Sequence, residues 1–252
     1  CVRLVGSEMC IRDRLKEVYK SSPFGVVSSF LIGISHSAVF SLIAVYATSM
    51  NFSILEVSIV TFLFAISGAI SQWPIGKLSD VLDRRIVIIY TTFGAALFCF
   101  LAIISSGQMY MPAGLATSKI FFYICIMCFS FCSLPMFALI FAHTNDFIPK
   151  EKFVAAGAGL QFVFGLGAIC GPFMCSLFME FLGENGFFIF LIIFHSFIGL
   201  FGIYRMQIRE SGDNPDSQFA PMPQTITPAG IELNPSTEPI DEPNNLNEFK
   251  KI

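Results

Sequence analysis

The sequence has little charge for its length. Only 13% of its 252 residues are charged and the formal net charge is −3, whereas 54% are hydrophobic and 30 are Phe. Soluble domains usually carry about 25% charged residues, so the composition excludes an ordinary soluble domain. Basic residues do not gather on any stretch long enough to grip a phosphate backbone, which disfavours nucleic acid as a partner.

Signatures of enzymes and metal sites are also missing. The sequence contains no His-Glu-x-x-His, no Gly-x-Ser-x-Gly and no Walker lysine loop, so neither hydrolysis nor ATP-driven pumping has support. We predict no enzyme activity and no cofactor. The eight cysteines do not indicate a disulfide framework, because most lie in apolar runs. Cys125, Cys128 and Cys132 form one helical stripe, which we interpret as small apolar packing and not as a metal site.

Long apolar runs are what the sequence does contain. Six stretches lack Asp, Glu, Lys and Arg: 24–47, 57–75, 86–106, 120–142, 153–179 and 186–204. Each is near or above the roughly 20 residues that a helix needs to cross a hydrocarbon core of about 30 Å. Continuous apolar runs lack the alternation of a membrane β-barrel. The sequence therefore predicts an all-α membrane protein with six transmembrane helices in the lipid bilayer.

The basic residues near these stretches are distributed unequally between the two sides. One side takes Lys16, Lys20, Lys77, Arg84, Arg85, Lys150, Lys152, Arg205 and Arg209, and the other takes Lys119 alone. By the positive-inside rule the richer side is cytoplasmic. We predict an integral protein of the plasma or inner membrane, with both termini of this segment in the cytoplasm.

The two ends of the sequence differ from the middle. The opening string, Cys1 to Arg14, resembles a translated sequencing-adapter remnant, so we exclude it from the fold and expect the natural chain to begin upstream. Residues 211–252 hold seven of the thirteen prolines, and we predict a disordered cytoplasmic tail there. This tail is either a docking segment for a partner or solvated filler. The transmembrane domain is expected over 15–210.

Five charged residues interrupt the apolar pattern in the string PIGKLSDVLDRR, Pro74 to Arg85, between the second and third stretches. The string resembles the loop signature of the major facilitator superfamily, Gly-x-Leu-x-Asp-basic-x-Gly-basic-basic. The matching residues are Gly76, Leu78, Asp80, Arg84 and Arg85. Val81 stands where a basic residue is usual and Asp83 where Gly is usual, and such departures are typical of the weaker copy of the motif, between helices eight and nine.

Further strings agree with this resemblance over about 21–209. AHTNDFIPKEKF after the fourth stretch and GLGAICGP in the fifth are similar to the C-terminal half of such a transporter, helices seven to twelve. The strings SPFGVV, QWPIGKLSD, DRR and AHTND most resemble the YcaD-like branch. The resemblance implies half of a twelve-helix bundle, built as a 3+3 inverted repeat. It also implies two partners, a missing N-terminal half of six helices and a small-molecule substrate.

The charged loop is the strongest candidate for a functional site. Close approach of backbones requires Gly76, and Leu78 would seat the turn against a neighbour. Asp80 is suited to face a helix N-terminus, which in the family belongs to the opposite half. The resemblance also implies a contact between Arg84 and Asp146, at the end of the fourth stretch. Such a loop is either a latch that holds one state of the transporter or an anchor at the membrane edge.

Glycines are frequent in the fifth stretch, where Gly157, Gly159, Gly165, Gly167 and Gly171 offer surfaces for close helix packing. Pro172 follows them and favours a kink, because it removes one backbone hydrogen bond. The glycines therefore serve either packing alone or packing together with bending during gating.

Polar residues inside the stretches are few. His36 lies in the middle of the first, where the resemblance implies a central cavity, and it is either a proton-linked group or a histidine hydrogen-bonded to Ser35, Ser37 or a neighbouring helix. Tyr46, Gln72 and Gln161 could also line the cavity, although buried amides usually join helices. His195, in the last stretch, is expected on the outer layer without a role. Since no acid or base lies inside any stretch, ion coupling would depend on histidine or on the missing half.

Two functions remain from different classes. The first is a secondary transporter that moves a small solute by alternating access, with this chain as its C-terminal half. The second is a membrane sensor, scaffold or homodimer that does not transport and is built on the same half fold. The motif favours the first, and a tail that binds a partner would favour the second.

Overall fold

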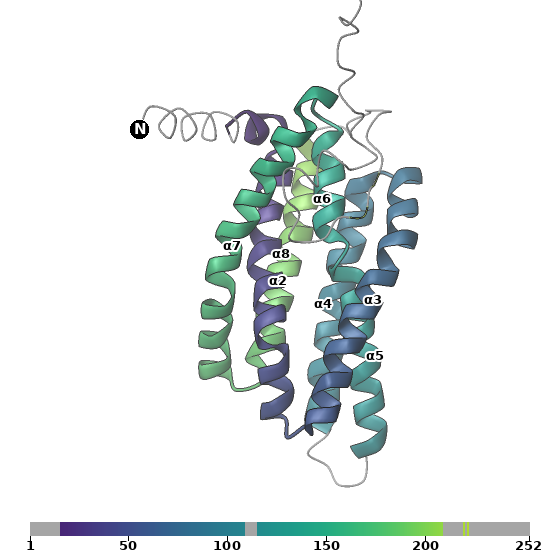
Figure 1. Ribbon diagram of the computed structural model, residues 1–252, viewed down its shortest axis with the longest axis vertical. Coiled ribbons are helices and arrows are strands. Elements are labelled where there is room, and N and C mark those ends of the chain that lie inside the picture. The colour runs from purple at the N-terminus through teal and green to yellow at the C-terminus, as the bar shows by residue number, and fades with distance from the viewer. Residues whose placement is uncertain (1–15, 109–114, 209–218, 220, 222–252) are drawn as a thin grey trace, which may run out of the picture.

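The computed structural model describes residues 16–108, 115–208, 219 and 221. Every regular element among them is helical, and the helices run up and down in one bundle (Figure 1). They are α2 (Pro23–Ser49), α3 (Ile54–Val81), α4 (Arg84–Gln108), α5 (Leu115–Ser133), α6 (Met136–Asn145), the short η1 (Lys150–Lys152), α7 (Phe153–Leu182) and α8 (Gly186–Ile208). Because α5 and α6 share one crossing, the described helices provide six membrane spans, which confirms the predicted all-α membrane fold. The predicted remnant, 1–14, and the predicted tail, apart from Phe219 and Pro221, lie outside the described residues.

Local sequence signals set the ends of several helices. The Ser22 hydroxyl accepts a hydrogen bond from the N–H of Gly25 at 3.2 Å, and Pro23 begins α2 at a position where a missing N–H costs little. Ser53 and Glu56 form a reciprocal capping box at the start of α3. Gly183 ends α7 with φ at +69°, a left-handed conformation that favours glycine. These caps keep the connections short, so successive spans alternate in direction.

The fourth span is broken at Leu134 and Pro135, a feature that the apolar run 120–142 did not predict. α5 ends at Ser133 and α6 begins at Met136. The break follows from Pro135, which has no N–H to continue the helical ladder and disfavours helical geometry at the residue before it. Beyond the break, α6 packs against α2 and α4. The fourth span therefore packs against α3 and α4 through α5, and against α2, α4 and α7 through α6.

The spans are arranged in two groups of three. α2, α7 and α8 pack together, α3, α4 and α5 pack together, and α4 contacts α8 between the groups (Figure 1). If the first three spans are exchanged with the last three, the α2–α7 contact becomes α5–α3, the α4–α5 contact becomes α8–α2, and α4–α8 maps onto itself. Observed packing thus has the symmetry of a 3+3 repeat.

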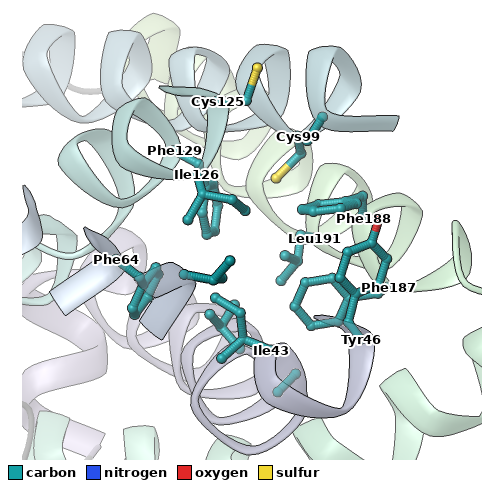
Figure 2. Close-up of a cluster of buried hydrophobic side chains, with 14 of the residues drawn as sticks. Ile43, Tyr46, Phe64, Cys99, Cys125, Ile126, Phe129, Phe187, Phe188 and Leu191 are labelled. Carbon is teal, nitrogen blue, oxygen red and sulfur yellow. The ribbon is translucent and has the colours of Figure 1, made fainter. Parts of the chain in front are cut away.

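The two ends of the bundle have different interiors. The arginine end, at the top of Figure 1, comprises the start of α2, α4 and α7 and the end of α3, α6 and α8, with Arg84 and Arg85 at the start of α4. At the opposite, aromatic end, Tyr46 packs among Phe122, Phe187 and Phe188 within the largest apolar cluster. Figure 2 shows the rings of Tyr46, Phe187 and Phe188 beside one another.

Large apolar side chains also cover the outside of the bundle, as expected for a surface in lipid. Trp73 on α3 and Phe173 and Phe181 on α7 are exposed. The α3 and α7 spans bury the smallest shares of their apolar windows, 28% and 22%, against 67% for the α5–α6 span. α3 and α7, which the symmetry relates, thus present the least covered flanks of the bundle.

Candidate functional site

Arg84 connects three helices at the arginine end. Its Nη1 donates hydrogen bonds to Asp146 Oδ1 at 2.5 Å and to the carbonyl of Ala142 at 3.0 Å, and its Nη2 donates to Asp80 Oδ1 at 2.9 Å. The guanidinium is buried, and Asp146 is nearly so. The implied contact between Arg84 and Asp146 is therefore present. Asp80, for which the resemblance implied a partner in the opposite half, is a second carboxylate on the same arginine, so the cluster ties the end of α3 and the end of α6 to the start of α4.

Asp83, one of the two departures from the motif, caps α4. Its Oδ1 accepts hydrogen bonds from the backbone N–H of Arg85 at 2.9 Å and from Arg85 Nε at 3.1 Å, and its Oδ2 accepts one from Arg85 Nη2 at 2.7 Å. Burial alone would raise the pKa of Asp83, but the hydrogen bonds from Arg85 outweigh burial and hold this pKa below its ordinary value. The acid at this position thus satisfies a backbone N–H at the helix start, which the usual glycine could not do with a side chain.

The rest of the motif differs from expectation. Leu78 was predicted to seat the turn, but it is 48% exposed, because it lies on the outer face of the last turn of α3. A Cβ on Gly76 would lie 2.2 Å from the ring of Phe219, so the close neighbour of Gly76 is this ring and not a helix backbone. The backbone N–H of Phe219 also donates to Asp80 Oδ1 at 2.9 Å. One residue of the predicted tail thus contacts both Gly76 and Asp80.

A second polar group lies in the bundle interior, where His36, Ser133 and His195 meet. His36 Nε2 is 3.1 Å from both the carbonyl and the hydroxyl oxygen of Ser133, and the same hydroxyl is 2.8 Å from His195 Nε2. His195 Nδ1 is 2.9 Å from the carbonyl of Leu191. All three side chains are buried. The prediction that His195 lies on the outer layer is wrong, because its face of α8 is turned inward against α2 and α5.

Both polar groups lie within the stretch that matches a known family. The family model of the Major Facilitator Superfamily matches residues 25–239, which include the motif loop and all of the hydrogen-bonded histidines. The chain belongs to the Major Facilitator Superfamily. The loop between α3 and α4 therefore resembles the motif of the family to which the chain belongs.

Curated relatives of the superfamily chain are named as transporters. The chain is 23% identical over 201 residues to the uncharacterized MFS-type transporter YE1530 of Yersinia enterocolitica, and the match covers 80% of this chain and 47% of the relative. It is 27% identical over 189 residues to the uncharacterized MFS-type transporter YfkF of Bacillus subtilis, covering 72% of this chain and 44% of the relative. The chain thus spans about half the length of the curated relatives it matches.

The predicted cavity residues of this superfamily chain are dispersed. Tyr46 stacks on Phe122 and Phe187 and is 1% exposed, so rings from neighbouring helices surround it, which favours the alternative that it joins helices. Gln72 on α3 and Gln161 on α7 are partly buried, and neither lines the two clefts at the arginine end, one beside Arg85 and the other beside Lys152. Of the predicted cavity residues, His36 lies in a polar group, with Ser133 and His195.

The glycines of α7 divide into two classes. A Cβ on Gly167 would lie 2.2 Å from the carbonyl oxygen of Phe30, and one on Gly171 would lie 2.2 Å from that of Ile34, so both allow α7 to approach α2 closely. Among the described residues nothing lies within 4 Å of such an atom on Gly165, so the packing role predicted for Gly165 stays a prediction. α7 continues through Pro172 to Leu182.

Sequence reasoning missed Ser133, His195 and Phe219. Ser133 had one available signal, because it stands directly before Leu134 and Pro135, where the helix must break. His195 had none, since α8 is apolar on nearly every face and shows no inward stripe. Phe219 lies among tail residues whose composition indicated disorder.

Proposed function

We propose that this chain is the C-terminal half, helices seven to twelve, of a secondary transporter that moves a small solute by alternating access. The observation that carries the proposal is the Arg84 cluster, in a chain of this superfamily. Its bonds to Asp80 and Asp146 are charge-assisted and tie together the ends of three successive spans, at α3, α4 and α6. Such bonds can be exchanged for water when the helix ends separate, which suits a latch.

A first test compares Arg84→Ala, Arg84→Lys and, as a control at the aromatic end, Glu56→Gln. Solutes that raise the melting temperature of the intact protein identify a substrate, and uptake into proteoliposomes then measures transport. Loss of uptake is expected for Arg84→Ala and Arg84→Lys, because an ammonium cannot contact two carboxylates and a carbonyl in one plane. Uptake at the wild-type rate in Arg84→Ala would contradict the latch and favour the alternative that the loop is a membrane-edge anchor.

The partner in this proposal is an N-terminal half of six helices. Two observations support this partner: the match covers only about half of the relative, and α3 and α7 have exposed flanks. Sequencing the source DNA upstream of Leu15 tests it: six more apolar spans in frame are expected. A start codon near Leu15 would contradict the proposal and favour a homodimer of the half fold.

The proposed orientation places the arginine end in the cytoplasm of a cell bounded by a plasma or inner membrane. The basic residues at this end support it, because only Lys119 lies at the other. A fluorescent protein fused after Ile208 should fold and fluoresce, whereas alkaline phosphatase fused there should be inactive. The reverse pattern would invert the proposed topology.

One observation favours the alternative of a sensor that signals through its tail, namely the hydrogen bond from Phe219 to Asp80. Truncation before Gln218 separates the alternatives. A transporter should retain solute uptake without the tail, whereas a sensor should bind its solute and lose its output to a partner.

A further inference from the structure

Phe219 is the next described residue after the end of α8, and it lies against the C-terminal end of α3. Its backbone N–H donates a hydrogen bond to Asp80 Oδ1 at 2.9 Å, and a Cβ added to Gly76 would lie 2.2 Å from its ring. Gly76 and Asp80 are four residues apart in a helix, so they lie on one face of α3. Phe219 therefore contacts this face with its backbone and with its side chain.

The side chain of Phe219 also joins two apolar clusters. The first cluster includes Ile75 of α3 and Met136 of α6, and the second includes Phe141 of α6 and Phe153 of α7. Within the part of the chain that the structure describes, Phe219 is the only partly buried apolar residue that packs against both clusters. Its ring thus lies where the end of α3 meets α6 and α7.

The end of α8 is near enough to supply this residue. α8 ends at Ile208, at the same arginine end as the end of α3. α4 contacts both α8 and α3, so α3 lies about two helix spacings from α8, roughly 20 Å. An extended chain from Ile208 to Phe219 spans about 36 Å. The connection can therefore reach the Gly76 face of α3.

The charges of the two parts are complementary. Residues 211–252 contain seven acids and two lysines, whereas nine of the ten basic residues near the spans lie on the side of the arginine end. Opposite charges attract over about a Debye length, 8 to 10 Å at physiological salt. Charge therefore favours the placement of these residues near the arginine end.

From these contacts we propose that Phe219 is an intramolecular clamp that ties the end of α3 to α6 and α7. α3 cannot move away from them while the ring is in place, because the ring would have to leave either Gly76 or the second cluster. Asp80 Oδ1 also accepts a hydrogen bond from Arg84 Nη2 at 2.9 Å, so the clamp and the Arg84 cluster share one carboxylate. The clamp is releasable, because Phe219 lies outside the spans and its departure breaks no helical hydrogen bond.

Release of the clamp uncovers the Gly76 face of α3 and leaves Arg84 on Asp80. The end of α3 should then separate from α6 and α7 more often, and local separation of this kind speeds the exchange of backbone amide protons with solvent. The clamp acts on helix ends alone, so it does not depend on the proposed transport.

Hydrogen–deuterium exchange of the intact protein in lipid nanodiscs tests the clamp. Phe219→Ala should speed exchange at the ends of α3 and α6 by about 5- to 30-fold, the factor that corresponds to the loss of about 1 to 2 kcal/mol. Phe249→Ala, which truncates the other phenylalanine of residues 211–252, is the matched control and should leave exchange unchanged. Phe219→Leu, which keeps an apolar side chain and the N–H, should retain most of the protection.

Gly76→Ala tests the same contact from the side of α3. With Phe219 present, the added Cβ displaces the ring, so exchange at the end of α3 should become faster. In the Phe219→Ala protein the same change should slow exchange, because alanine stabilises a helix relative to glycine. An equal effect of Gly76→Ala in both backgrounds would overturn the proposal.

Three further results would overturn the clamp. They are wild-type exchange in Phe219→Ala, an equal acceleration by Phe249→Ala, and an acceleration in Phe219→Ala that extends over every span. Exchange is measured without a solute, so the outcome is independent of whether the protein transports one.

Discussion

The two ends of the bundle are held together by different interactions. At the arginine end, Arg84 joins α3, α4 and α6 through two carboxylates and a carbonyl. At the aromatic end, Tyr46 and Phe188 are enclosed by other rings. Apolar contacts lose their stabilisation when they separate in an unfilled space, whereas charged groups can exchange protein partners for water. The aromatic end is therefore held by apolar contacts, whereas the arginine end is held by charge-assisted bonds, whose protein partners water can replace.

Phe188→Ala should give the largest loss of stability among these variants, because the aromatic end depends on its buried rings. The side chain is fully buried among Tyr46, Phe122 and Phe187, and removing such a ring costs about 3 to 5 kcal/mol. Unfolding in mixed detergent micelles measures the loss. Phe181→Ala, an exposed ring on α7, is the control and should stay within about 0.5 kcal/mol of wild type.

Arg84→Ala should have the next largest effect, because it leaves Asp146 nearly buried beside Asp80 without the arginine. An unsatisfied group of this kind costs about 1 to 3 kcal/mol. A double-mutant cycle with Asp146→Ala measures the coupling, which should be about 0.5 to 3 kcal/mol. A coupling near zero would mean that other contacts hold the arginine end, and it would contradict the contrast between the two ends of the bundle.

Asp83→Ala should cost about 0.5 to 2 kcal/mol, the usual worth of an N-cap. The folded-state pKa of Asp83 lies below its ordinary value, so its stabilisation is complete above that ordinary value and is lost as the pH falls through the lower folded-state pKa. Stability measured against pH should show this loss in the wild type. Asp83→Asn should keep the cap and lose this acid dependence, and an unchanged pH profile in Asp83→Asn would contradict the assignment.

The overall fold could be predicted from the sequence because its signal, the long charge-free runs, does not depend on which side chain faces which neighbour. A charge-free run of membrane length has one stable solution in lipid, a helix, and six such runs gave six spans. The Arg84–Asp146 contact was also accessible, through the superfamily resemblance. The cap formed by Asp83 was overlooked because the resemblance defined the residue as a departure, although an acid before a helix is a capping signal in itself.

The interior polar group of His36, Ser133 and His195 could not be predicted from the sequence, for a different reason. Placing His195 requires knowing which face of α8 is turned inward, and a helix in lipid is apolar on inward and outward faces alike. His36 was recognised as a polar residue in mid-span, but its partner Ser133 lies 97 positions away. Only the packing of α2 against the fourth span brings them together.

Lys119→Ala at the aromatic end should have the smallest effect and tests whether charge matters equally at both ends. Lys119 Nζ lies 2.6 Å from Glu56 Oε1 and 5.1 Å from the centre of the Phe52 ring. The pair is partly open to solvent, and such pairs contribute about 0 to 1 kcal/mol. Measured by the same unfolding assay, the loss should therefore be smaller than that of Arg84→Ala. An equal loss would mean that the aromatic end also depends on its charges, and it would contradict the contrast between an end held by aromatic rings and an end held by charged groups.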